Sequence, residues 1–135
     1  MSCVRNWALA AALAVSAPAA LAQAPSQEQM ARDLNNYAVI VAGYEIDGRC
    51  QVLAPSQRAE LASHIKVIET GFQAMGLPGR VIGDIAAKAR TAGADGHQGC
   101  DAKTAETVER IGVFALKMGT GMAEWLAKRK PSATQ

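Results

Sequence analysis

The sequence lacks the motifs by which many enzymes and electron carriers are identified. It contains no Gly-x-Ser-x-Gly, no His-Glu-x-x-His, and no phosphate-binding glycine loop followed by Lys-Ser or Lys-Thr. Cys-x-x-Cys is absent, and with it the haem-attachment signature Cys-x-x-Cys-His. The sequence therefore gives no support for an enzyme and implies no cofactor. Without a haem-attachment signature, it also lacks the simplest indication that the protein is an electron carrier. No motif is specific enough to identify a family.

An excess of one charge sign is also lacking. The 135 residues contain 14 Lys and Arg against 12 Asp and Glu, and loss of the N-terminal segment with Arg5 would leave 13 against 12. A protein dedicated to nucleic acid usually carries a strong basic surplus on its binding surface. Nucleic acid is therefore not expected as a partner.

Apolar runs long enough to span a membrane are missing as well. Residues 1–6 carry one positive charge, Arg5, and no acid, and an apolar stretch covers Trp7 to Val15. Pro18 interrupts it, so it falls short of the roughly 20 residues that a spanning helix needs. Ala20-Leu21-Ala22 has the small residues that signal peptidase recognises. We predict a cleaved signal peptide over residues 1–22 and a periplasmic or secreted mature chain, with a membrane anchor as the alternative.

Cysteine is scarce, and only two cysteines would remain after cleavage, because Cys3 lies in the predicted signal peptide. Cys50 and Cys100 fall in two separate gaps between helical segments. Disulfides persist in exported proteins, so we predict that these two cysteines pair. Closing a loop of about 50 residues would stabilise the fold by roughly 4 kcal/mol in the chain-entropy description. A redox-active pair is disfavoured because the cysteines are far apart in sequence.

What the mature chain does have is helical periodicity. Apolar residues recur at steps of three and four, which indicates amphipathic helices. The first helix is predicted from Gln27 to Ile46, with Ser26 as its N-cap and Asp47-Gly48 as its end. The second follows Pro55 with Ser56 as its cap, and it ends in the glycine and proline of residues 76–79.

Two further helices complete the pattern. The third is predicted from Arg80 to Ala92, where Gly93 would stop it, and the fourth begins after Asp101 as its cap. Gly119-Thr120-Gly121 predicts a kink or break in the fourth helix; alternatively, Ala115, Gly119 and Ala123 form a smooth strip for close helix packing. The predicted core positions on the four helices are Met30, Leu34, Tyr37, Val41, Tyr44; Leu61, Ile65, Ile68, Phe72, Met75; Ile82, Ile85, Ala89, Ala92; and Val108, Ile111, Ala115, Met118, Met122, Trp125.

Four amphipathic helices with short connections predict an all-α fold, an antiparallel up-down four-helix bundle over residues 23–130. Residues 131–135 form a short polar tail that we expect to be disordered. In this topology the first and third inter-helix loops lie at one end of the bundle. The predicted disulfide would join these two loops.

Three groups of residues are candidates for a functional site. Asp95, His97 and Asp101 lie close together in a glycine-rich loop and could bind a metal, although a loop bend, a solvated histidine and a helix cap are the favoured explanation. A ligand pocket inside the bundle could use Tyr37, Tyr44, His64, Met118 and Met122, which otherwise serve as core or boundary residues. Trp125 with Lys128, Arg129 and Lys130 could meet a partner or an anionic membrane surface, or simply end a helix.

These features predict a small exported helical protein that binds a protein partner or small ligand without catalysis. Two alternatives remain open from the sequence. One is a metal-handling protein that uses the loop of residues 95–101. The other is an enzyme with an unrecognised site, for which a deep pocket containing His64 or another ionisable group would be the first support.

Overall fold

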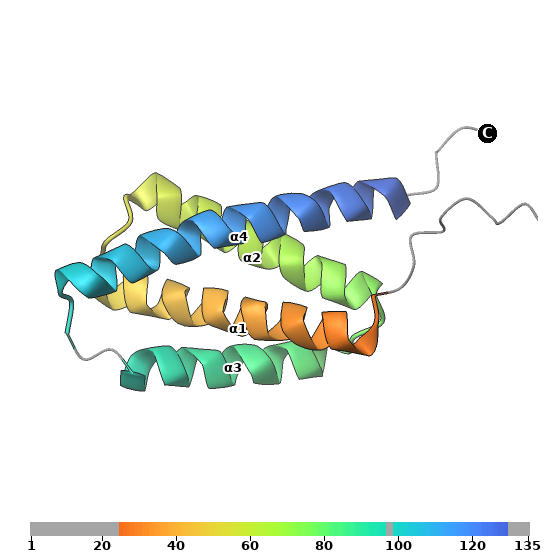
Figure 1. The fold of residues 1–135 in the computed structure, drawn as a ribbon, viewed down its shortest axis with the longest axis horizontal. Coiled ribbons are helices and arrows are strands. Elements are labelled where there is room, and N and C mark those ends of the chain that lie inside the picture. Colours follow the sequence, from red (N-terminus) through yellow and green to blue (C-terminus); the bar gives the residue numbers. More distant parts are fainter. Residues whose placement is uncertain (1–24, 97–98, 130–135) are drawn as a thin grey trace, which may run out of the picture.

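The computed structural model describes residues 25–96 and 99–129, which form four helices and no strand. These are α1 (Gln27–Cys50), α2 (Pro55–Ala74), α3 (Gly79–Gly96) and α4 (Ala102–Arg129). Successive helices run in opposite directions, which confirms the predicted up-down bundle (Figure 1). The predicted signal peptide, His97, Lys130 and the C-terminal tail lie outside the described residues. None of the described helices is both long and apolar enough to cross a membrane.

The bundle is built from two closely packed pairs of parallel helices. α1 packs most extensively against α3, α2 packs most extensively against α4, and contacts between α1 and α4 join the two pairs. Figure 1 shows α1 beside α3 and α2 beside α4. Although α3 and α4 are consecutive, their described residues do not pack against each other. Each inter-helix connection therefore passes from one pair to the other.

The core follows the predicted stripes closely on α1, α2 and α4. Tyr37 and Phe72 are fully buried at its centre, with their rings edge to face at 5.7 Å between centroids. Of the predicted positions only Ala92 is wrong, because it is exposed. The buried stripe of α3 runs through Ile82, Ala86, Ala89 and Gly93, whereas the predicted stripe has Ile85 and Ala92 in place of Ala86 and Gly93. The other predicted core residues are buried or partly buried against the core.

The first helix ends later than predicted. α1 continues through Asp47 and Gly48 to Cys50, and Gln51 takes the left-handed conformation with φ 50° that terminates it. The predicted end was wrong because the Asp47 side chain is buried and bonded across the turn, where its Oδ1 accepts from Leu53 N at 2.8 Å. Cys50 is consequently the last residue of α1 rather than a loop residue.

Two other helix boundaries differ from the prediction. Ser56 does not cap α2, because the helix already begins at Pro55; Ala54 is the N-cap residue, and its N–H donates to Gln57 Oε1. Gly93 does not stop α3, which runs to Gly96. A side chain at Gly93 would have its Cβ only 2.7 Å from Ala42 O, so this glycine allows α3 to approach the α1 backbone. The predicted caps at Ser26 and Asp101 are confirmed.

α4 runs as one helix from Ala102 to Arg129, so the predicted break at Gly119-Thr120-Gly121 does not occur. The alternative prediction, close helix packing along Ala115, Gly119 and Ala123, is confirmed for the first two of these residues. Ala115 and Gly119 are buried, and a Cβ on Gly119 would lie 2.5 Å from His64 Nδ1 on α2. Ala123 is exposed, and Met122 occupies the next buried position. Gly119 therefore supplies the room for a side chain from the neighbouring helix.

Candidate functional site

A pocket of about 250 Å³ lies between α2 and α4. On each helix the lining residues recur three or four positions apart, so they share one helix face. Its apolar wall consists of Leu53, just before α2, with Leu61, Gly112, Val113 and Leu116, and its polar wall consists of Gln57, Glu60, His64 and Glu109. The site thus combines an apolar surface with an imidazole and two carboxylates.

The apolar side chains on the α4 side of this pocket are unusually exposed to solvent. Val113 is 57% exposed and Leu116 is 44% exposed. Gly112 leaves further room between them, because a Cβ built on it would meet no atom within 4 Å. Neighbouring exposed apolar side chains on the rim of a concave site are typical of surfaces that bind something.

His64 forms part of the α2 wall. Its ring is held against α4 by the close approach of Gly119. The Nε2 atom is buried and has no hydrogen-bond partner in the described part of the chain. Glu60 Oε1 lies 3.7 Å away, which is too far for a hydrogen bond. A buried polar atom without a partner destabilises the fold by about 1–3 kcal/mol, so a small rotation of Glu60 toward Nε2 would be favourable.

The two carboxylates of the pocket lack a basic partner. Neither Glu60 nor Glu109 has a Lys or Arg nitrogen within 4.0 Å among residues 25–96 and 99–129. The other ion pairs in this part of the chain are Glu28 with Arg32, Asp47 with Arg58, and Glu106 with Arg110. The pocket is therefore acidic at its edge and apolar inside.

The other residues predicted for an internal pocket do not join His64. Tyr37 is fully buried, and its hydroxyl donates to Glu69 Oε1 at 2.6 Å. Burial, reinforced by this hydrogen bond, raises the pKa of Tyr37 above its usual range. The Arg58 guanidinium covers the Tyr44 ring at 3.9 Å, and Met122 packs against Gly71. Met118 is partly buried against the core.

The residues of the predicted metal loop are only partly described. Asp95 is exposed in the last turn of α3. Asp101 caps α4, where its Oδ1 accepts from Thr104 N at 2.8 Å and from Thr104 Oγ1 at 2.9 Å. These hydrogen bonds, the backbone one first, lower the pKa of Asp101. His97 lies outside the described residues, and no three His, Cys, Asp or Glu side chains within the described ranges are grouped to hold a metal.

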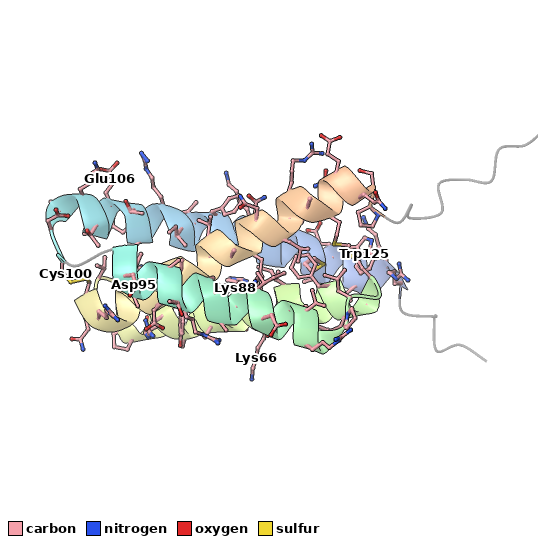
Figure 2. All side chains as sticks on the ribbon, turned by 90° about the horizontal axis from the view of Figure 1, so that it is seen from below. Lys66, Lys88, Asp95, Cys100, Glu106 and Trp125 are labelled. Carbon is pink, nitrogen blue, oxygen red and sulfur yellow. A yellow bond between two sulfur atoms is a disulfide. The ribbon has the colours of Figure 1, made fainter. Side chains whose placement is uncertain are left out.

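The basic C-terminal residues lie far from this loop. Figure 2 shows Trp125 at the opposite end of the bundle from Cys100 and Asp95. The Arg129 guanidinium stacks over the partly buried Trp125 ring at 4.5 Å, and Lys128 is exposed beside it. These contacts place two cations in the last turn of α4, where they offset the negative helix end.

Most of the pocket was missed from the sequence, which singled out only His64. A signal was nevertheless present in α4. Val113 and Leu116 are apolar but lie outside the stripe of Val108, Ile111 and Ala115 that predicts the core. Large apolar residues off the core stripe indicate an exposed apolar face.

Comparisons of the chain with family models, curated proteins and solved structures find no match. The pocket between α2 and α4 is therefore the feature from which a function is inferred.

Proposed function

We propose that this chain is an exported, non-catalytic binding protein that holds the apolar part of a small ligand in the pocket between α2 and α4. The observation that carries the proposal is the pocket itself, with the exposed side chains of Val113 and Leu116 on one wall. Its volume of about 250 Å³ is at the small end of known ligand sites, which favours a group no larger than one aromatic ring. The Cys50–Cys100 disulfide supports an oxidising, exported location in the periplasm or outside the cell.

Binding is favoured over catalysis by the residues of the pocket. The pocket pairs an imidazole, His64, with a carboxylate, Glu60, but its walls contain no Ser, Thr, Cys or Lys. Catalysis by an activated hydroxyl, thiol or amine needs such a group within hydrogen-bond reach of the base, and the pocket offers only carboxylates in its place. The imidazole and carboxylate are therefore better explained as polar contacts for a bound molecule.

A substitution that fills the pocket tests this proposal. Gly112→Leu would place a side chain in the pocket, because a Cβ at this position meets no atom within 4 Å. Replacing an interior helix glycine also raises the free energy of unfolding by up to about 1 kcal/mol, so lost binding would not reflect unfolding. The probes are three compounds with the same ring: phenethyl alcohol, phenethylammonium and phenylacetate. Amide chemical shifts in a two-dimensional NMR titration of the oxidised protein measure binding.

We expect saturable shifts on α2 and α4 with at least one probe, with a Kd on the order of 1 mM for so small a compound. Gly112→Leu should abolish them. Gly121→Leu is the matched control, because this glycine is on the same helix and also faces open space but does not line the pocket. The proposal is wrong if none of the three probes binds, or if Gly112→Leu binds as well as the native protein.

A further inference from the structure

We infer that the pocket selects a small organic cation, an ammonium group attached to an apolar body. This inference rests on the proposed binding function and specifies the ligand class. Apart from His64, the ionisable residues lining the pocket are Glu60 and Glu109, one from each helix. A cation between them would meet a carboxylate on each side, while its apolar part would contact Leu61 and Leu116.

The α4 sequence shows why Glu109 is available for a ligand. Glu106 has Arg110 four residues later and pairs with it at 3.4 Å. Figure 2 shows Glu106 pointing away from the bundle. Glu109 instead has Val113 at the corresponding position, and Val113 lines the pocket. The helix therefore places an apolar surface, rather than a basic side chain, beside this carboxylate.

Glu60 on α2 likewise has no Lys or Arg four residues later. Its neighbour four residues later is His64, and the 3.7 Å separation leaves the Glu60 carboxylate without a hydrogen bond from Nε2. Two carboxylates beside a low-dielectric apolar wall focus a negative potential on the space between them. The charge of an organic cation would be attracted by that potential, and its apolar part would cover the exposed apolar rim.

Glu60 also couples the ligand to His64. A cation that draws the Glu60 carboxylate to itself keeps it from closing the hydrogen bond to His64 Nε2. Binding should therefore change the ring ¹⁵N chemical shifts of His64. Weak attraction of a cation to the general protein surface would leave this ring unchanged, so the His64 signals report binding at the pocket itself.

The rank order of the three phenyl probes tests the charge preference. At low ionic strength, phenethylammonium should bind about fivefold to tenfold more tightly than phenethyl alcohol, because each exposed ion pair contributes modestly. Phenylacetate should bind more weakly than the alcohol. Glu60→Gln and Glu109→Gln should each weaken phenethylammonium binding about threefold and leave the alcohol unchanged.

Glu124→Gln is the matched control for the two acidic residues. It removes the same charge from α4 about 22 Å from Glu109 along the helix axis, a distance that exceeds the screening length of about 10 Å in 0.1 M salt. Phenethylammonium binding should be unaffected by it.

The inference is overturned if phenethyl alcohol or phenylacetate binds as tightly as phenethylammonium in a manner sensitive to Gly112→Leu, an outcome that would leave the proposed binding function standing. It is also overturned if Glu124→Gln weakens binding as much as Glu109→Gln does. Absence of binding by all three probes would instead refute the binding function itself.

Discussion

At the scale of single residues, Asp47 is the side chain whose surroundings differ most from its appearance in the sequence. Asp47-Gly48 looks like a turn, yet the Asp47 side chain is fully buried within α1. Oδ2 pairs with Arg58 Nη1 at 2.7 Å, and Oδ1 accepts from Leu53 N. The same guanidinium donates to Tyr44 O at 3.1 Å. One carboxylate thus holds the end of α1 and the start of α2 together.

Asp47→Ala should lower the free energy of unfolding by about 3 kcal/mol, because it leaves Arg58 and the Leu53 N–H without their buried partner. Urea denaturation followed by circular dichroism measures the change. Glu28→Ala is the control, since it removes the exposed Glu28–Arg32 pair and should cost no more than about 0.5 kcal/mol. Equal effects of the two substitutions would show that Asp47 has no structural role beyond a surface charge.

At the scale of helices, Gly83 and Gly93 of α3 have very different surroundings. A Cβ on Gly93 would lie 2.7 Å from the Ala42 carbonyl oxygen, whereas a Cβ on Gly83 would meet no atom within 4 Å. Gly93→Ala should therefore force α3 away from α1 and destabilise the protein by about 2 kcal/mol. Gly83→Ala should stabilise it by up to about 1 kcal/mol through helix propensity. Thermal melts of the two variants should shift in opposite directions; stabilisation by both would contradict the close contact of α1 and α3.

Helix number, order and most buried faces could be predicted from the sequence because periodicity is local. Leu61, Ile65, Ile68 and Phe72 lie on one face of α2 in any packing, and all four are buried. The caps at Ser26 and Asp101 could also be predicted, but the ends of α1 and α3 and the continuity of α4 could not. Gly93 looks like a stop signal, but its function depends on contact with Ala42, which is distant in the sequence.

The candidate site was predictable to a smaller degree. His64 was recognised as a boundary residue, and it does line the pocket. Its partners on α4 were not recognised, because periodicity identifies the core face of a helix but not which helix lies beside it. Glu60 and Glu109 become one site only when α2 and α4 lie side by side. The pairing of α2 with α4, and of α1 with α3, is not visible in the spacing of apolar residues.

At the scale of the whole molecule, the disulfide fixes the end of α1 to the start of α4, two helices that also pack against each other. The described residues of α3 and α4 do not pack against each other, although a short connection joins them. Cys50 ends α1, and Cys100 lies just before the Asp101 cap of α4, with 5.4 Å between their Cα atoms. Arg49 Nη1 also donates to Ala94 O at 2.8 Å near the end of α3. Covalent and polar contacts thus fix this end of the bundle.

The double substitution Cys50→Ser with Cys100→Ser should therefore destabilise the protein strongly. Loss of a cross-link that closes a loop of 50 residues should cost up to about 4 kcal/mol, equivalent to a fall in Tm on the order of 15 °C for a domain of this size. Differential scanning calorimetry measures the shift. The native protein melted in a thiol reductant should show the same fall, whereas the serine variant should be insensitive to the reductant. An unchanged Tm in the reduced native protein would mean that helix packing alone stabilises this end of the bundle.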